Sequence, residues 1–419
     1  MIYRIKPIIE QYARLPKPFI WNGNTIAFEQ QAAIVTAYIL RKDSDNSVYP
    51  LREEAEQVLA YWAECLCEPI DTLCTELQAD IQSKPFQSQA DTKFTFIDLF
   101  AGIGGFRTAM QNLGGRCIFS SEWDENAQKT YYENYGDVPF GDITLETTKE
   151  AIPEHFDVLC AGFPCQAFSL AGKKRGFEET RGTLFFDVAE ILRRRQPRVF
   201  FLENVKGLAI HDHGRTLQTI LQTLDEIGYV VPKPQIVNAM YFGVPQHRER
   251  IYIVGFRKDL DISREMFQYP QQEEVTHKFI DIREQQPVPA KYYLSETYWN
   301  TLIRHKERHA AKGNGFGYEI IKDNEVSNAI VVGGMGRERN LVIDTRQNDF
   351  THTTHIKGEY NKLGIRRMTP REWARLQGYS DDFRIVVSDV NAYKQFGNSV
   401  AVPAIQATAY NLLTTAKII

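Results

Sequence analysis

The chain has 419 residues, of which 43% are hydrophobic and 24% charged, a composition typical of a globular protein with two or three domains. It has no apolar run of about 18 residues and no recognisable secretion leader, so we expect neither a membrane span nor export, and a cytoplasmic location. The formal net charge of −4 does not indicate a nucleic-acid partner, yet it does not exclude a local basic surface. Residues 291–367 carry 13 Lys and Arg against 9 Asp and Glu.

Residues 1–90 are expected to form a separate helical extension. Residues 27–42 and 51–82 are rich in helix formers, with apolar side chains three and four positions apart. The extension is acidic, with 8 Lys and Arg against 12 Asp and Glu. The polar stretch 83–93, which contains Pro85, is predicted to be a linker.

From residue 94 onward, short apolar runs alternate with amphipathic stretches. We predict strands within 93–100, 115–122, 156–162, 198–205 and 250–256, and helices within 106–114, 125–135, 184–195 and 215–228. This alternation predicts a largely parallel sheet with helices on both faces. Residues 258–365 have no clear helical period and are expected to be irregular. A helix should begin at Thr369, where Thr-Pro-Arg-Glu supplies an N-cap, a proline in the first turn and a capping-box Glu372.

The segment FIDLFAGIGGF, residues 96–106, is predicted to be a strand followed by a glycine turn that opens a helix. Such a turn lets the backbone approach a ligand closely. Glu122 lies twenty residues beyond Gly102, the spacing at which a carboxylate reaches ribose hydroxyls in nucleotide-binding units, and Trp123 offers a flat face to an adenine. The pattern therefore predicts an adenosine-containing ligand without saying which one, and a purely structural turn with a surface Glu is the alternative.

Four polar side chains follow or interrupt these strands. Cys165 follows a strand at the edge where open sheets bind ligands, and the Lys and Arg after it could activate a thiolate. The alternative is a small buried hydrophobe, the role we assign to Cys160. Glu203 lies in the apolar run VFFLENV, where burial would raise its pKa and make it a proton donor, unless it pairs with Arg or solvent. Arg248 and Arg250 share one face of a strand, or form a solvated basic edge.

In this order, the motifs resemble the cytosine-5 DNA methyltransferase family from about residue 94 to 410. The resemblance rests on FIDLFAGIGGFR, SSEWDENA, GDIT, GFPCQAFSLAG, GTLFFDVAEIL, ENVKGL, QHRERIYIVGF, RRMTPREWARLQGY and YKQFGNSVAVP. It implies an α/β fold with a doubly wound mixed sheet, the S-adenosylmethionine-dependent methyltransferase fold. The implied domains are the helical extension 1–90, a catalytic domain over 91–257 and 366–419, and a smaller irregular target-recognition domain over 258–365.

The resemblance also implies S-adenosylmethionine as the methyl donor, and roles for individual residues. Those implied to contact the donor are Phe100, Gly102, Gly104, Glu122 at the ribose, Trp123 at the adenine face, Asp142 and Ile143 at the adenine edge, and Pro164, Asn398 and Ser399 around the pocket. Cys165 would attack C6 of a cytosine flipped out of double-stranded DNA, while Glu203 would protonate or hydrogen-bond its N3. Arg248 and Arg250 would hold the base and support the catalytic loop. No metal is required.

Recognition of the DNA sequence is expected from residues 258–365. Arg337, Arg339 and Arg346 are of the type that reads guanine edges, with phosphate or surface roles as the alternative. The segments KYYLS, HKERHAAKGNGFGYEII and NAIVVGGMGRERNLVID look very like those of family members that modify the inner cytosine of CCGG in restriction–modification systems, and a CC-x-GG site is the second choice. We expect a monomer. The other functions considered are a tRNA cytosine-5 methyltransferase, a nicotinamide-dependent dehydrogenase and a non-enzymatic DNA-binding regulator.

Overall fold

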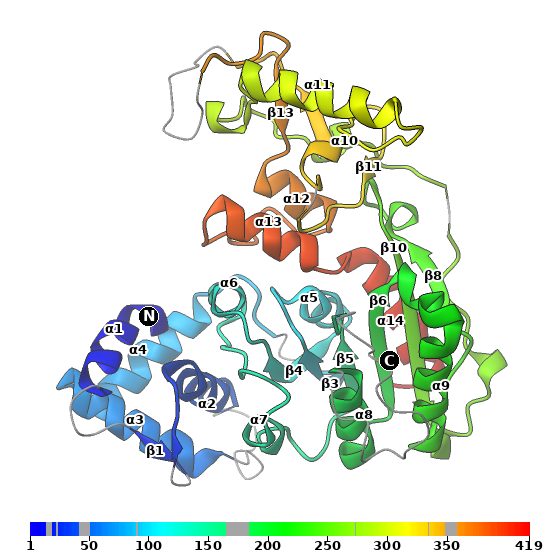
Figure 1. Cartoon of the computed structure of the whole chain (residues 1–419). Helices are drawn as coiled ribbons and strands as arrows, with labels where there is room; N and C mark the ends of the chain where they lie inside the picture. The colour runs from blue at the N-terminus through cyan, green and yellow to red at the C-terminus, as the bar shows by residue number, and fades with distance from the viewer. Residues whose placement is uncertain are drawn as a thin grey trace. The chain divides into compact units, whose positions relative to one another are not determined.

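The structure, a computed structural model, describes residues 1–13, 19–21, 24–41, 51–88, 91–164, 184–272, 274–333, 335–347 and 358–419. The chain divides into two compact units (Figure 1). Unit 1 comprises Met1–Ile236, Arg250–Pro270 and Thr408–Ile419, and unit 2 comprises Val237–Glu249 and Gln271–Ala407. The predicted division into an extension, a catalytic domain and a recognition domain stays a prediction.

The N-terminal part of unit 1 is helical, as predicted. Its elements are α1 (Ile2–Ala13), β1 (Ile20–Trp21), β2 (Asn24–Thr25), α2 (Phe28–Arg41), α3 (Arg52–Leu66) and α4 (Ile70–Gln82). The predicted helical stretch 51–82 is two helices, because Cys67 adopts a left-handed conformation with φ 55° and ends α3. Buried side chains such as Trp62 and Leu77 belong to the same hydrophobic core as those of the sheet that follows.

Unit 1 is built around a seven-stranded mixed sheet, which confirms the predicted fold class. The strand order is β4 (Gly115–Ser121), β3 (Phe94–Leu99), β5 (Val158–Ala161), β6 (Val199–Val205), β10 (Glu249–Arg257) and β7 (Tyr229–Val230), with β8 (Gln235–Asn238) also paired to β10. Strands β3 to β6 pair in parallel, and β10 pairs antiparallel with both β6 and β7. The intervening helices are α5 (Gly105–Asn112), α6 (Glu125–Tyr135), α7 (Glu146–Glu150), α8 (Leu184–Arg195) and α9 (Arg215–Glu226).

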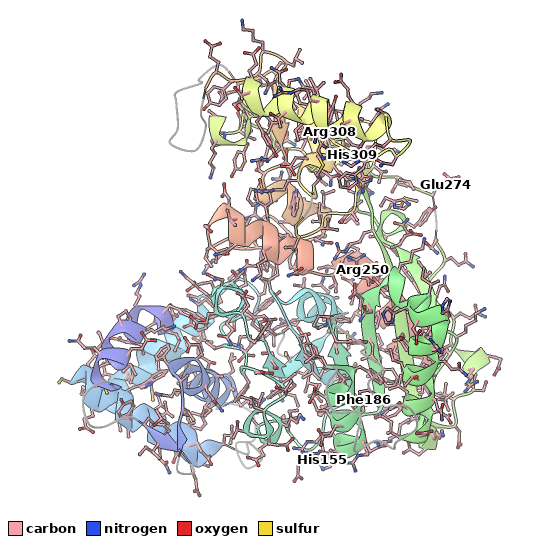
Figure 2. All side chains as sticks on the ribbon, in the orientation of Figure 1. His155, Phe186, Arg250, Glu274, Arg308 and His309 are labelled. Atoms are coloured by element: carbon pink, nitrogen blue, oxygen red, sulfur yellow. The ribbon has the colours of Figure 1, made fainter. Side chains whose placement is uncertain are left out.

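The direction of the strands determines which residues gather at one edge. Because β3, β4, β5 and β6 are parallel, the chain leaves all four at the same edge of the sheet. Strand β10 is antiparallel to β6, so Arg250 near its start lies opposite Val205 at the end of β6. Figure 2 shows Arg250 at this edge and His155, which precedes β5, at the opposite one.

Unit 2 contains short strands and several helices. Its elements include β9 (Gln246–His247), α10 (Phe279–Ile282), α11 (Glu296–Ala310), β11 (Ser327–Asn328), β12 (Leu341–Ile343), β13 (Ile365–Arg367), α12 (Pro370–Leu376) and α13 (Asp389–Asn398), and α14 (Val402–Thr415) begins in it. Strand β11 pairs in parallel with β9, and β12 pairs antiparallel with β13. The expectation that residues 258–365 lack a regular helix is wrong for α11. The apolar side chains of this helix, Tyr298, Trp299, Leu302 and Ile303, recur at helical spacing and pack in one hydrophobic cluster, so the signal was present in the sequence but lay among many polar residues.

The start of α12 is as predicted. The Thr369 hydroxyl accepts from the Glu372 backbone N–H at 3.1 Å, and the Glu372 carboxylate accepts from the Thr369 N–H at 2.8 Å. Glu372 also accepts two hydrogen bonds from the buried guanidinium of Arg366, which bonds Asp344 as well. No helix in the described part of the chain is long and apolar enough to cross a membrane.

Candidate active site

The glycine turn after β3 opens space at the carboxyl edge of the sheet. Phe100, Gly102 and Gly104 have positive φ values of 55°, 55° and 83°. A Cβ at Gly104 would overlap the ring of Tyr135, so this glycine is required for close packing on α6. A Cβ at Gly102 would meet no atom of the described residues within 4 Å. The turn is therefore packed tightly on one side and leaves free space beside Gly102.

Glu122 directly follows β4 and faces this turn. Its carboxylate accepts from the backbone N–H of Gly102 and from that of Asp124, both at 2.8 Å. Burial raises the pKa of Glu122, although these two backbone donors favour the charged form. The predicted link between the glycine turn and the acidic residue twenty positions later is thus a direct hydrogen bond. Trp123, next in the chain, has 79% of its surface exposed and is available for stacking.

A second segment meets the end of β4. Phe140 donates its backbone N–H to Ser120 and accepts from the N–H of Glu122, both at 2.8 Å, so this segment is bridged to the end of β4 at Phe140. Ile143 is buried, and Asp142 is held by hydrogen bonds from Thr144 to its Oδ1.

These features fit an adenosine group. They supply open space beside Gly102, carboxylate oxygens at Glu122 for ribose hydroxyls, an exposed indole at Trp123 and a carboxylate at Asp142.

The predicted nucleophile Cys165 lies outside the described residues, but the turn that leads to it is described. Asn204 donates from its side-chain Nδ2 to the carbonyl of Phe163 at 2.9 Å. This bond joins the turn after β5 to the end of β6, and Pro164 follows it at the exposed end of the described segment. Cys160 is buried in β5, as expected, and burial raises its pKa well above the usual value.

Glu203 and Arg250 meet at the same edge of the sheet. The Arg250 Nε lies 3.1 Å from Glu203 Oε1, and their side chains are 15% and 11% exposed. Of the two possibilities left open for Glu203, the structure contains the pairing with an arginine. Glu203 is one residue before Asn204, so the ion pair and the turn before Cys165 are fixed by neighbouring residues of one strand.

Arg248 has quite different partners, although it is only two residues from Arg250. Its buried guanidinium donates to the carbonyls of Ile330 at 2.8 Å, Ser399 at 2.6 Å and Gly397 at 3.2 Å. All of these residues belong to unit 2. Ser399 is buried and its hydroxyl lies 2.7 Å from that of Tyr379, whereas Asn398 is exposed at the end of α13.

The three arginines predicted to read DNA also differ in their surroundings. Arg346 donates to both carboxylate oxygens of Asp344 and to the carbonyls of Glu284 and Gln285. Arg339 pairs with Glu319 at 2.9 Å and has 46% of its side chain exposed. Arg337 lies over the ring of Tyr393, 5.5 Å from its centre. Base reading by any of them stays a prediction.

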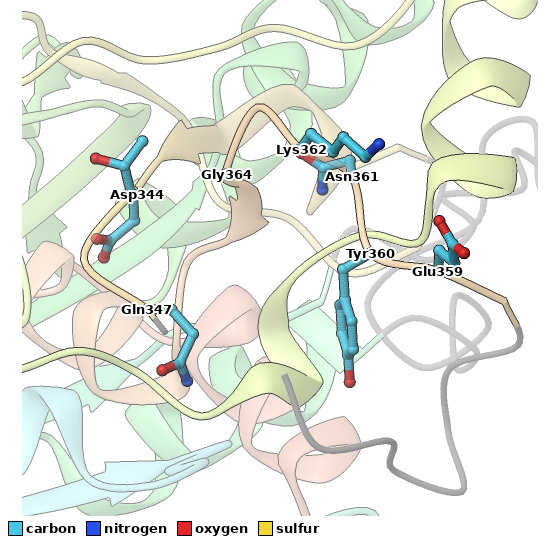
Figure 3. A pocket seen from close by; sticks show the side chains of 8 residues that line it. Asp344, Gln347, Glu359, Tyr360, Asn361, Lys362 and Gly364 are labelled. Atoms are coloured by element: carbon cyan, nitrogen blue, oxygen red, sulfur yellow. The ribbon is translucent and has the colours of Figure 1, made fainter. Parts of the chain in front are cut away.

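Unit 2 also contains a cavity of about 390 Å³, shown in Figure 3. It is lined by Asp344, Thr345, Gln347, Glu359, Tyr360, Asn361, Lys362 and Gly364. Asn361 is committed to the fold, because its side chain bonds the backbone of Leu294 and Ile365. The predicted catalytic and cofactor residues are not among the residues that line this cavity.

Two features of the site were missed in the sequence. Asp98 in β3 is buried, both of its carboxylate oxygens lack a hydrogen-bond partner among the described residues, and burial raises its pKa well above the usual value. An acidic residue inside the apolar run FTFIDLF was a visible signal. The bond from Asn204 to Phe163 had no such signal, because it joins residues 41 positions apart.

Residues 94–414 match the family described as C-5 cytosine-specific DNA methylase, and the chain belongs to this family. It is therefore a DNA (cytosine-5)-methyltransferase, as the motifs predicted, and the dehydrogenase and the non-enzymatic regulator are set aside. The type II methyltransferase M.HpaII of Haemophilus parainfluenzae is 71% identical over 322 residues, 77% of this chain and 89% of the relative.

More distant proteins agree with this placement. M.SsoII of Shigella sonnei, another type II methyltransferase, is 45% identical over 81% of this chain and 86% of its own. The crystal structure of S. pombe Dnmt2 superimposes with a TM-score of 0.56 over 77% of this chain and 98% of that one. At 19% identity, this last likeness shows the fold alone.

Proposed function

We propose that this enzyme transfers a methyl group from S-adenosylmethionine to C5 of the inner cytosine of CCGG in double-stranded DNA, as the modification enzyme of a restriction–modification system. The observation that carries the chemistry is the hydrogen bond from Asn204 to Phe163, because it holds the turn before Cys165 beside the Glu203–Arg250 pair. The identity with M.HpaII and the likeness of the recognition segments to CCGG-modifying enzymes support the target.

Cys165 acts as the covalent nucleophile in this proposal. C5 of cytosine is a weak nucleophile, so the Cys165 thiolate first forms a bond to C6, which makes C5 electron-rich. Glu203, whose carboxyl Arg250 orients, protonates or hydrogen-bonds N3, where negative charge develops during this addition. When bound, S-adenosylmethionine would supply the methyl group for C5 and leave as S-adenosylhomocysteine. The C5 proton then passes to water, the N3 proton returns to Glu203, and the bond between C6 and sulfur breaks so that the thiolate returns.

The two arginines of the QHRER segment divide the supporting work. Arg250 orients the Glu203 carboxyl through its Nε and stays beside the base. Arg248 is a positioning residue, since its guanidinium is occupied by carbonyls of Ile330, Gly397 and Ser399. It keeps the Ser399 turn and the segment at Ile330 in one arrangement.

Specificity is assigned to the segment around Arg337 and Arg339. Arg339 is half exposed and has a single acidic partner, so it can exchange Glu319 for a guanine edge. Arg346 makes four hydrogen bonds within unit 2 and is assigned a structural role. The Arg339→Ala enzyme should lose discrimination at one base pair, whereas Arg346→Ala should lose stability.

The test uses the full chain, S-adenosylmethionine with a labelled methyl group, and four substrates: duplexes with CCGG, CC-x-GG or neither site, and tRNA. We expect label in the CCGG duplex only, and bisulfite sequencing should place it on the inner cytosine. Label on the outer cytosine or in CC-x-GG would overturn the proposed target but leave the chemistry intact. Label in tRNA alone would overturn the proposed substrate class.

A further inference from the structure

The four N-terminal helices pack against the part of unit 1 that carries the candidate adenosine site. We call residues 1–88 the N-terminal module; it precedes residue 94, where the family match begins. Its buried side chains, among them Val35 and Trp62, share one hydrophobic core with Val138, Phe140 and Ile143. The module is therefore packed onto the segment that contains two of the residues expected at the adenine.

One set of contacts reaches helix α6, which begins directly after Trp123 and Asp124. The Lys6 ammonium pairs with Glu29 of the module and with Glu125, the first residue of α6, at 3.2 Å. One helical turn from the other end, the Tyr132 hydroxyl donates to Asp80 of α4. Both ends of α6 are thus tied to the module by polar contacts.

Lys84 strengthens the second of these ties. It is almost fully buried, its Nζ lies 3.2 Å from Asp80 and 3.1 Å from Glu133 of α6, and it lies over the Tyr132 ring at 4.6 Å from the centre. These contacts fix the helix whose first turn follows the exposed indole of Trp123.

A second contact reaches the segment that leads to Asp142 and Ile143. The Thr36 hydroxyl, fully buried in α2, accepts from the backbone N–H of Val138 at 3.0 Å. Two residues on, Phe140 bonds Ser120 and Glu122, and Asp142 follows. A displacement of Val138 would therefore be passed along the backbone to Glu122 and Asp142.

We propose that the N-terminal module is a buttress for the cofactor site: it holds Trp123, Glu122 and Asp142 in the arrangement that binds the adenosine part of S-adenosylmethionine. Thr36 is a positioning residue for this site. This inference rests on the proposed cofactor. The excess of acidic over basic residues, 12 against 8 in residues 1–90, agrees with a role away from the DNA phosphates.

The decisive variant is Thr36→Val in the full chain, which keeps the shape of the side chain and removes the acceptor for Val138. Titration calorimetry without DNA should show S-adenosylmethionine binding weakened by about fivefold or more, because the backbone donor is left buried without a partner. The KM for S-adenosylmethionine should rise in parallel, while the kcat at saturation and the Kd for DNA stay within about twofold. Thr36→Ser, which keeps the hydroxyl, should restore the affinity.

The matched control is Thr75→Val. Thr75 is exposed on α4, and among the described residues its hydroxyl bonds the carbonyl of Asp71 in the same helix and nothing else, so this variant should bind cofactor like the wild type. Hydrogen exchange of the apo enzyme supplies a readout without ligand. Residues 138–143 should exchange faster in Thr36→Val than in Thr75→Val.

Three outcomes would overturn the buttress. In the first, Thr36→Val keeps the wild-type cofactor affinity although residues 138–143 exchange faster. In the second, it weakens DNA binding as much as cofactor binding. In the third, Thr36→Val lowers kcat with an unchanged KM for S-adenosylmethionine. A wild-type enzyme that binds no S-adenosylmethionine at all would instead refute the proposed cofactor.

Discussion

Replacement of Arg248 should destabilise unit 2, whereas replacement of Arg250 should affect turnover. In Arg248→Met, the carbonyls of Ile330 and Gly397 lose the donor that the structure gives them, while Ser399 keeps a bond from Gln377 at 3.2 Å. Each buried carbonyl left unpaired costs about 1–3 kcal/mol. Two such groups give about 2–6 kcal/mol.

Part of this cost is offset, because methionine removes a buried charge that was itself expensive to desolvate. We therefore expect a net loss of about 2–4 kcal/mol in the free energy of unfolding of unit 2. With an m-value of about 2 kcal/mol per molar urea, the midpoint of its transition should fall by about 1–2 M.

The assay is urea unfolding of the full chain, followed by circular dichroism and by hydrogen exchange at residues 327–333 and 397–400. Arg304→Met is the control in the same unit, because Arg304 is exposed on α11 and its bonds to described residues all lie within its own helix. It should change stability by less than about 0.5 kcal/mol. If Arg248→Met kept the wild-type urea midpoint but lost activity, the positioning role would be refuted, and Arg248 would instead be expected to contact the target base.

Three further predictions concern the chemistry and the N-terminal module. Cys165→Ala should abolish methyl transfer and leave S-adenosylmethionine binding, measured by calorimetry, intact. A duplex with 5-fluorocytosine at the target should trap a protein–DNA adduct with the wild type only. Residual transfer by the variant would exclude the thiol mechanism. Glu203→Gln should slow single-turnover methylation about 10²–10⁴-fold, because an amide is a far weaker acid; an unchanged rate would make Glu203 structural. Burial opposes ionisation of Asp80, yet hydrogen bonds from the Met1 ammonium and Tyr132 and the charge of Lys84 lower its pKa to about 2. Because the pKa of Asp80 is lower in the folded than in the unfolded state, the ionised carboxylate stabilises the fold at pH values above about 4, and this stabilisation is lost as the pH falls toward 2. The difference in urea midpoint between wild type and Asp80→Asn should therefore shrink between about pH 4 and about pH 2.

The sheet and its helices could be predicted because their apolar side chains recur at regular intervals. Helix α6 covers residues 125–135 and α8 residues 184–195, the same limits that the sequence indicated. The contact between Glu122 and Gly102 was equally accessible, because it depends on a fixed spacing within one strand–helix–strand unit. Such patterns can be predicted because they depend on residues that are close together in the sequence.

The division of labour between Arg248 and Arg250 could not be predicted in the same way. The prediction that both arginines share one face of a strand is wrong for Arg248, which lies between β9 and β10, whereas Arg250 belongs to β10. What separates the two is the set of partners that the fold brings to them. The acceptors of Arg248 lie 82, 149 and 151 residues further along the chain. Helix α11, by contrast, could have been predicted, because Tyr298, Trp299, Leu302 and Ile303 recur at helical spacing.

The boundary between the two units falls between Glu249 and Arg250, so one short motif contributes to both. In unit 2, Gln246 accepts from the Ile330 N–H and donates to the Leu376 carbonyl, and Arg248 bonds other backbone carbonyls of the same unit. In unit 1, Arg250 pairs with Glu203, the candidate general acid. A lysine could replace neither arginine. At position 248, a lysine ammonium lacks the planar guanidinium that donates to several carbonyls at once. At position 250, lysine lacks the Nε that pairs with the Glu203 carboxylate. Loss of activity in a variant of this motif therefore has two distinct physical causes, and only a stability measurement beside the rate separates them.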